Sequence, residues 1–170
     1  MTVLSRQAIA ERLRSSEPLV EGMPDAVSQL QPQGVDLTLA TLARLSTGGQ
    51  IGPTNEERVL SEQTPVEFDA GGWAYLSPGT YMCRFNETVH LPLDLMGFGR
   101  TRSSLLRCGV SLHTAVWDAG YSGRSESLLV VYNPKGVRLA RNARIMQLVL
   151  LKLDRATSEG YAGRFLRENM

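Results

Sequence analysis

The hydrophobic positions at the start of the chain follow a helical period. Ala8, Ile9 and Leu13 fall on one helix face, and Ser5 precedes them at the position of an N-cap, with Leu4 placed to pack on Ile9. We therefore expect a short helix within residues 1–16. The polar stretch 16–32 contains several prolines and indicates a connection, with a short edge strand near Leu19 and Val20.

After this connection the period changes to two, which is typical of β-strands. The alternation is clearest where Val35, Leu37 and Leu39 flank Asp36 and Thr38. Similar runs follow at 66–68, 73–76, 81–85, 128–132 and 147–153, and Gly-Gly, Pro-Gly and Asn-Pro signals separate them. The pattern predicts an all-β fold of the jelly-roll or β-barrel kind, with one N-terminal helix and a single domain over residues 1–170.

Two segments break the alternation. Residues 50–64 are polar and charged, which indicates a surface loop or an excursion between strands. Residues 155–170 carry few apolar side chains. We expect this C-terminal segment to be a mobile arm.

Composition places the chain among ordinary globular proteins. Of its 170 residues, 42% are hydrophobic and 21% are charged, which argues against wholesale disorder and against a repetitive fibre. The apolar runs are far shorter than the roughly 20 residues of a membrane span, and the N-terminus lacks the apolar region of a secretory signal. We expect a cytoplasmic protein in which Cys83 and Cys108 are small buried hydrophobes.

The charge distribution limits the kinds of partner. A net charge of +1 argues against a general nucleic-acid or membrane-surface binder, so any anion site must be local. Among 18 basic residues only Lys135 and Lys152 are lysine. Arginine suits bidentate phosphate recognition, although a biased codon usage explains the same ratio.

The densest group of candidate residues lies between Gly97 and Gly123. Arginines at 100, 102 and 107 surround the hydroxyls of Ser103 and Ser104, an arrangement that suits a phosphate site at the start of a helical turn. The alternative is an ordinary helix capped by one of the serines, with solvated arginines. Spacing alone leaves both interpretations open.

A second candidate is Asp118, which lies between Trp117 and the pair Gly120-Tyr121. A carboxylate beside an aromatic ring in a partly dry pocket can act as a general base toward water. An Asp-x-Gly turn, in which the aspartate bonds its own backbone, is the ordinary alternative. Tyr121 is either a core residue or a platform beneath a sugar ring.

Five stretches of the sequence together carry a family resemblance: QPQGVDLTL (31–39), GRTRSSLLRCG (99–109), AVWDAGYSGR (115–124), ARIMQLVLLKL (143–153) and YAGRF (161–165). In this order they resemble the motifs of the dUTPase and dCTP deaminase superfamily, and LSRQAIAERL resembles the N-terminal helix of its deaminase-like branch. The resemblance implies a homotrimer of distorted jelly rolls of the dUTPase type.

The superfamily contains two reactions, and one position separates them. The deaminases carry a proton-shuttling acid three residues before an asparagine like Asn133, where this chain has Val130. Glu126 shares the strand face of Val130 by alternation, so it could fill that role only in another register. The form WDAGYSGR followed by LLVVYN most resembles the monofunctional archaeal-type dUTPases.

The resemblance therefore implies a dUTP diphosphatase, which converts dUTP and water to dUMP and diphosphate. Two alternatives remain open. One is a dCTP deaminase, or a bifunctional deaminase and dUTPase. The other is a catalytically silent jelly roll that binds a nucleotide or a protein partner.

The resemblance also implies a role for each candidate residue. Asp118 activates the water, and Mg²⁺ is held mainly by the nucleotide, with Asp36 steadying its water shell. The substrate-binding set consists of Arg102, Ser103, Ser104 and Gln147 for the phosphates, Arg164 for the γ-phosphate, Tyr121 for deoxyribose, and His113, Thr114, Ala115 and Val116 for uracil. His113 is as readily an ordinary hydrogen-bonded histidine, Gln147 a plain strand residue, and Asp36 a tie for a loop.

The expected partners are a small-molecule nucleotide and two further copies of the chain. No nucleic acid and no membrane are expected. Because sites in this family form between subunits, apolar residues such as Phe98, Leu112 and Trp117 are expected to become buried only on assembly.

Overall fold

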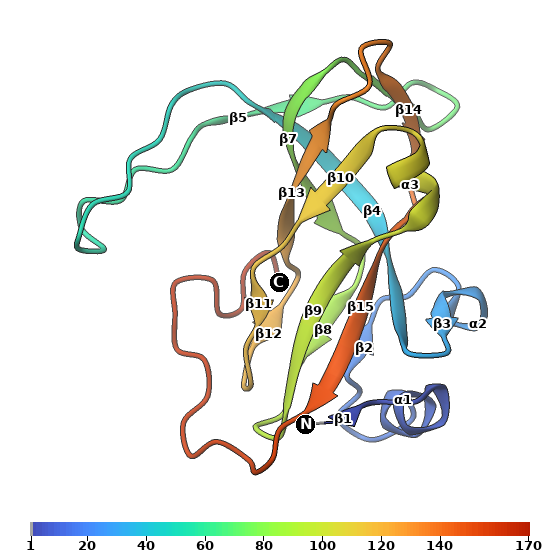
Figure 1. The fold of residues 1–170 in the computed structure, drawn as a ribbon, viewed down its shortest axis with the longest axis vertical. Helices are drawn as coiled ribbons and strands as arrows, with labels where there is room; N and C mark the ends of the chain where they lie inside the picture. The colour runs from blue at the N-terminus through green and yellow to red at the C-terminus, as the bar shows by residue number, and fades with distance from the viewer. Residues whose placement is uncertain (1) are drawn as a thin grey trace.

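The structure, a computed structural model, describes residues 2–170 and confirms the all-β prediction (Figure 1). Its helices are α1 (Arg6–Leu13), α2 (Ala26–Gln29) and α3 (Ser103–Arg107). Its strands are β1 (Thr2–Val3), β2 (Val20–Glu21), β3 (Leu30–Gln31), β4 (Gly34–Leu45), β5 (Gln63–Val66), β6 (Trp73–Leu76), β7 (Gly79–Phe85), β8 (Thr88–His90), β9 (Leu95–Thr101), β10 (Val110–His113), β11 (Val116–Trp117), β12 (Ser122–Gly123), β13 (Glu126–Val131), β14 (Val137–Ala140) and β15 (Arg144–Lys152). Within these residues no helix is long and apolar enough to cross a membrane.

The N-terminal helix begins where its cap predicts. The Ser5 hydroxyl accepts a hydrogen bond from the Ala8 backbone N–H at 3.4 Å, and both Leu4 and Ile9 are buried beside it. Helix α2 was not expected, because it is a single turn within a polar stretch. Asp25 caps it by accepting hydrogen bonds from the N–H groups of Val27 and Ser28.

One large antiparallel sheet forms most of the fold. Its strands follow the order β10, β13, β7, β4, β15, β9 and β11, with β1, β3 and β5 attached to its side. The sheet curls back on itself, because Thr101 Oγ1 at the end of β9 accepts from the Leu112 N–H of β10 at 2.8 Å. Two small sheets, β12-β8-β2 and β14-β6, complete the distorted barrel.

Strand β4 is central and buried on both faces. Val35, Leu37 and Leu39 are fully buried, as the alternation predicts. Asp36 and Thr38 are also buried, with only 1% and 2% of their surface exposed. The alternating pattern alone would place these polar residues at the surface, but Asp36 faces Arg102 and Arg144, and Thr38 donates to the buried Glu87.

Strands β8, β9 and β14 were missed from sequence. The glycines of β9 weaken its apolar pattern, yet they are required by close strand packing: a Cβ at Gly99 would lie 2.3 Å from the sulfur of Met146. Cys83 is buried as expected, and burial raises the pKa of its thiol to about 12. Cys108 is exposed, contrary to expectation. It is the C-cap residue of the short helix α3, most of whose residues are exposed.

The segment between β4 and β5 is the expected excursion. It leaves the body of the molecule as a long loop, visible in teal in Figure 1, and is closed by the bridge between Gln50 and Val59 and by hydrogen bonds from Ser46 to Glu62. Its return end brings Leu60, Ser61 and Gln63 back over the face of β13.

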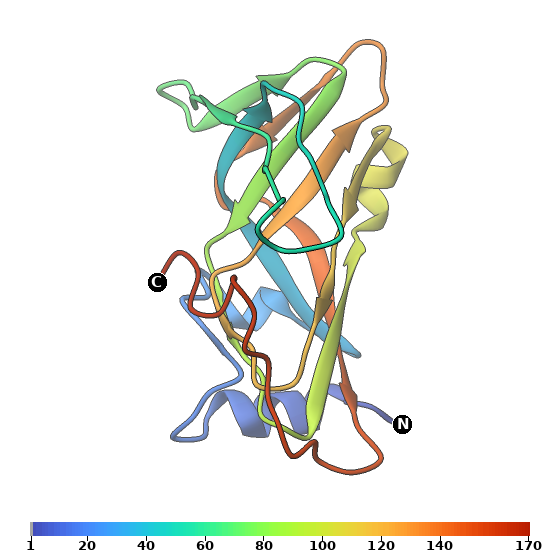
Figure 2. The same cartoon turned by 90° about the vertical axis from the view of Figure 1, so that its left-hand side faces the viewer.

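The C-terminal segment after β15 has no regular secondary structure but runs along the body of the protein (Figure 2). Its backbone is docked: Tyr161 N–H donates to Ala119 at 2.8 Å, Arg167 N–H donates to Ser122 at 2.7 Å, and Glu168 accepts from Arg124 N–H at 2.9 Å. The mobility of residues 155–170 stays a prediction. The structure adds the surface that holds them, residues 119–124, called the dock below.

A glycine contact fixes how closely the C-terminal segment approaches the dock. Gly120 has φ +82°, and a Cβ there would lie 2.6 Å from Gly160 Cα. Gly120→Ala should therefore loosen the segment, and trypsin should cleave after Arg164 roughly fivefold faster or more for each ~1 kcal/mol of lost docking energy. The matched control is Gly72→Ala, because Gly72 has φ +77° with open space around it. Equal cleavage in both variants would contradict this docking.

Candidate active site

One cleft of about 550 Å³ gathers five of the twelve predicted site residues. Its walls come from β13, from residues 113–118, from the C-terminal segment and from the return end of the 46–62 loop. Among the sequence-predicted residues it brings together His113, Ala115, Val116, Asp118 and Tyr121. It also contains Glu126 and Glu168, which the prediction left out of the site.

Asp118 is presented by a tight turn whose start is anchored. Trp117 is buried, and its indole N–H donates to Ser125 Oγ at 3.1 Å. The Asp118 carbonyl then accepts from Tyr121 N–H at 3.1 Å, and Gly120 supplies the positive φ that a type II turn requires. The turn is thus closed by the backbone of Asp118, which leaves its side chain for another purpose.

The carboxylate of Asp118 has no hydrogen-bond or ion-pair partner among residues 2–170. The ordinary Asp-x-Gly alternative required the side chain to bond its own backbone, and it does not. The carboxylate is exposed in the single chain, so the partly dry pocket that we expected is not formed by one copy. A free carboxylate on the wall of a cleft can accept a proton from a bound water.

Tyr121 lies beneath the C-terminal segment. Only 6% of its surface is exposed, its ring meets Tyr161 edge-on at 5.8 Å, and its hydroxyl donates to Glu168 Oε1 at 2.9 Å. Burial, together with the nearby Glu168 carboxylate, raises the pKa of Tyr121. Burial likewise raises the pKa of Glu168. The C-terminal segment therefore forms part of the cleft wall instead of hanging free.

Residues 113–116 run from the end of β10 to the start of β11, and the family resemblance assigns them to the uracil base. His113 is exposed and lines the cleft, and its Nε2 lies 3.4 Å from the hydroxyl of Tyr132, so it is not a core histidine. Ala115 and Val116 also line the cleft, while Thr114 donates weakly to the Gly99 carbonyl at 3.5 Å.

Glu126 is the acidic residue that β13 places in the cleft. Its face alternates with Leu128 and Val130 as expected, but only Glu126 and Leu128 reach the cleft, since the register pairs Leu128 with His113. Arg84 donates twice to Glu126 Oε1, from Nε at 3.0 Å and from Nη2 at 2.7 Å. Glu126 therefore reaches the cleft in the observed register, although its carboxylate is engaged by Arg84.

Arg102, Ser103 and Ser104 do not line the cleft. Helix α3 begins at Ser103 after the N-cap Arg102, and no side chain caps it, so the capped-helix alternative is not what the structure forms. Both serines are exposed. In one copy of the chain, the predicted phosphate-binding residues therefore lie outside the cleft that contains Asp118, the predicted general base.

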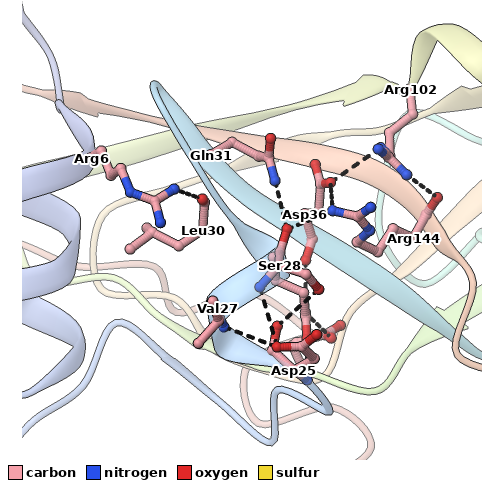
Figure 3. Close-up of polar contacts among 11 residues, drawn as sticks. Arg6, Asp25, Val27, Ser28, Leu30, Gln31, Asp36, Arg102 and Arg144 are labelled. Atoms are coloured by element: carbon pink, nitrogen blue, oxygen red, sulfur yellow. Dashed lines mark hydrogen bonds and ion pairs between the residues drawn. The ribbon is translucent and has the colours of Figure 1, made fainter.

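Arg102 instead belongs to a cluster around Asp36, shown in Figure 3. Asp36 Oδ2 lies 3.1 Å from Arg102 Nε and 3.4 Å from Arg144 Nη1. Burial raises the pKa of Asp36, while the two guanidinium groups act in the opposite direction. Sequence reasoning missed Arg144, because residues three apart on a regular strand point to opposite faces and the β-bulge between Arg144 and Met146, which brings Arg144 to the face of Gln147, leaves no pattern.

The described residues do not build a metal site. Residues 2–170 contain no group of three or more histidine, cysteine, aspartate or glutamate side chains placed to hold an ion. Asp36, the predicted contact to the metal's water shell, has 2% of its side chain exposed and faces two arginines. Its contact with a metal-bound water stays a prediction that the donor set does not favour.

The other predicted residues lie outside the cleft. Gln147 is half-buried on β15, where it pairs with Asp36 on one side and Arg100 on the other. Arg164 is exposed in the C-terminal segment, whereas its neighbour Phe165 reaches the cleft.

The three apolar residues expected at a subunit interface differ in how exposed they are in the single chain. Leu112 and Trp117 are already buried in the single chain, contrary to expectation, because β10 and β11 pack them inward. Phe98 remains 39% exposed, and it pairs across β9 and β11 with Val116, which is 43% exposed.

Comparison with known proteins finds one matching family and relatives that share one name. A sequence model of the family described as "dCTP deaminase-like" matches residues 3–153. The chain is 44% identical over 169 residues to a "Probable deoxyuridine 5'-triphosphate nucleotidohydrolase" of Methanosarcina mazei, covering 99% of each chain. It is 45% identical over 170 residues to a protein of the same name from Archaeoglobus fulgidus, covering 100% of this chain and 99% of the relative.

A solved structure shares the fold. The 2'-deoxycytidine 5'-triphosphate deaminase from Agrobacterium tumefaciens superposes with a TM-score of 0.65 at 22% identity. The match covers 87% of this chain and 47% of the deaminase chain.

Proposed function

The chain belongs to the dCTP deaminase-like family, and from this premise we propose that it is a dUTP diphosphatase, converting dUTP and water to dUMP and diphosphate. The observation that carries the proposal is the free carboxylate of Asp118 on the wall of a cleft large enough for a nucleoside. The full-length relatives named as dUTP nucleotidohydrolases favour hydrolysis over deamination.

In the proposed reaction Asp118 orients a water molecule and accepts its proton. The water oxygen forms a bond to the α-phosphorus, and the bond from that phosphorus to the oxygen bridging toward the β-phosphorus breaks. The bridging oxygen leaves with diphosphate. Asp118 suits this role because its turn fixes the backbone while no group among the described residues binds its carboxylate.

The cleft supports a position for the nucleoside. The segment of His113, Thr114, Ala115 and Val116 offers backbone donors and acceptors to the alternating polar edge of uracil. Tyr121 is packed against deoxyribose in this proposal, so that a 2'-hydroxyl finds no room and UTP is excluded.

The phosphates are bound by Arg102, Ser103, Ser104 and Gln147, with Arg164 of the C-terminal segment nearest the γ-phosphate. Magnesium enters as part of the substrate, as the Mg²⁺ complex of dUTP, because residues 2–170 gather no ligand set for it. The ion offsets the charge of the triphosphate oxygens when it is bound.

Deamination of dCTP is the second candidate reaction, and Glu126 is the observation that favours it. Its carboxylate lies in the same cleft as Asp118. A proton carrier must exchange its proton freely, but Glu126 Oε1 is bound twice by Arg84, and Gln63 Nε2 lies 3.3 Å from Oε2. We therefore assign Glu126 a structural role in the wall of the cleft.

The site is completed between subunits of a homotrimer. The phosphate residues of α3 are exposed and lie outside the cleft of their own chain, so a neighbouring copy has to supply them. The exposed apolar pair Phe98 and Val116 beside the cleft gives an assembly surface to bury.

Subunit complementation tests this arrangement. Asp118→Asn and Arg102→Ala should each be nearly inactive alone, whereas refolding an equal mixture should regain a measurable part of wild-type activity, because some interfaces then pair an intact Asp118 with an intact Arg102. Diphosphate release measures the result, and unmixed refolded variants are the control. A mixture no more active than its components would contradict a shared site.

A further inference from the structure

The side chain of Arg102 is held at two of its three nitrogens. Nε faces the buried carboxylate of Asp36 at 3.1 Å, and Nη1 donates to the Arg144 carbonyl at 3.2 Å (Figure 3). Among residues 2–170 the remaining nitrogen, Nη2, has no partner. Because 29% of the side chain is exposed, this free edge is available to an anion.

Arg144 shares the same carboxylate from the other side. Its Nη1 lies 3.4 Å from Asp36 Oδ2 and also donates to the carbonyl of Ser28. Its Nε and Nη2 have no partner among the described residues, and 34% of its side chain is exposed. Two guanidinium groups thus share the Asp36 carboxylate, and the exposed carboxylate of Asp25 also interacts electrostatically with Arg144.

The backbone of Asp36 is also fixed by a hydrogen bond. Gln29 Nε2 donates to the Asp36 carbonyl at 2.8 Å and to Glu87 Oε1 at 2.7 Å. Glu87 is fully buried and accepts from the Thr38 N–H at 2.8 Å. This buried network holds Asp36 in place beneath the two arginines, which preorganises them for a ligand.

We propose that Asp36 is a positioning residue that holds Arg102 in the orientation for binding polyphosphate, and that Arg144 is a second arginine of that phosphate site. The proposal rests on the function proposed above for the identity of the nucleotide. The site itself is defined by the chemistry of its arginines and takes any flexible polyphosphate chain.

A role limited to the charge of Asp36, or to a metal's water shell, makes the opposite prediction. A carboxylate beside an anion site repels the anion, so Asp36→Asn should tighten polyphosphate binding if the residue does nothing but carry charge. If it orients Arg102, the same substitution should weaken binding. The sign of the change thus separates the roles without any metal present.

Calorimetric titration with inorganic tripolyphosphate, in buffer with a chelator and no divalent metal, measures this sign. We expect Asp36→Asn and Arg144→Gln each to weaken binding about tenfold, and Arg144→Lys to weaken it less, because lysine keeps the charge but loses the fork. The matched control is Arg138→Gln, which removes an exposed arginine paired with Asp69 at 3.4 Å outside the cluster. It should change binding less than twofold.

The same variants are then titrated with a non-hydrolysable dUTP analogue. Parallel losses for analogue and tripolyphosphate support the proposal, and wild-type binding of tripolyphosphate without the analogue would contradict the nucleotide assignment while sparing the cluster. Tighter or unchanged binding by Asp36→Asn would overturn its positioning role. Arg144→Gln matching the Arg138→Gln control would overturn the second arginine, and this half stands even if Asp36→Asn does not fold, since Arg144 is partly exposed.

Discussion

Asp118→Asn should lower the turnover of dUTP by about 10²-fold or more while leaving nucleotide affinity within a few-fold of wild type. Asparagine has nearly the same shape as aspartate but cannot accept the proton of the attacking water. The turn should survive, because it is closed by the Asp118 carbonyl and the Tyr121 N–H and not by the side chain. Initial rates of diphosphate release and calorimetric binding of a non-hydrolysable analogue check both parts.

The control for this variant is Asp69→Asn. Asp69 is an exposed aspartate with 55% of its side chain accessible, outside the cleft and paired with Arg138. It should retain full activity. Wild-type turnover by Asp118→Asn would remove Asp118 from the reaction, whereas loss of affinity in place of turnover would make it a binding residue.

Deletion of residues 160–170 should leave a folded protein with activity lowered by roughly 10- to 100-fold. The segment contributes no residue to a strand or helix, so the barrel should keep its thermal unfolding temperature within a few degrees. It does contribute Tyr161, Phe165 and Glu168 to the cleft wall, and its loss opens the cleft to bulk water.

Arg164→Gln separates the two ways in which the segment could act. If the segment works as a cover, this variant should retain most activity, because Arg164 is exposed and outside the cleft. If Arg164 binds the γ-phosphate, the single substitution should reproduce much of the deletion's loss, mainly through KM. A fully active deletion protein would exclude both roles.

Periodicity predicted the elements that bury one face or follow a helical cap. The helix after Ser5 and the run at 34–39 are examples, since a cap and an alternation are local signals. Strand β9 was missed because its glycines weaken the apolar pattern. Gly99 is required there by the close approach of the Met146 side chain on β15, which is distant in sequence. Asp36 and Thr38 are buried on β4 because of covering segments that a local pattern does not encode.

The candidate site likewise combines features that the local sequence predicts with features that depend on tertiary contacts. The turn at Asp118 was predictable from its Asp-x-Gly-Tyr pattern, whereas its place in the site was only implied by the family resemblance, and the freedom of its carboxylate depends on three-dimensional contacts. Glu126 reaches the cleft because β13 pairs with β10 in one register, and register cannot be read from alternation. The docking of the C-terminal segment depends on backbone hydrogen bonds and on a Gly120-Gly160 contact, neither of which leaves an apolar signal.

The central claim is that the cleft hydrolyses dUTP and does not deaminate dCTP. The most direct measurement incubates the protein and Mg²⁺ with dUTP, dCTP or UTP, and resolves dUMP, dUTP, diphosphate and ammonia over time. We predict equal amounts of dUMP and diphosphate from dUTP, little reaction with UTP, and no ammonia from dCTP at enzyme levels that exhaust dUTP. Steady ammonia release from dCTP that Glu126→Gln abolishes would contradict the account and assign the cleft to deamination.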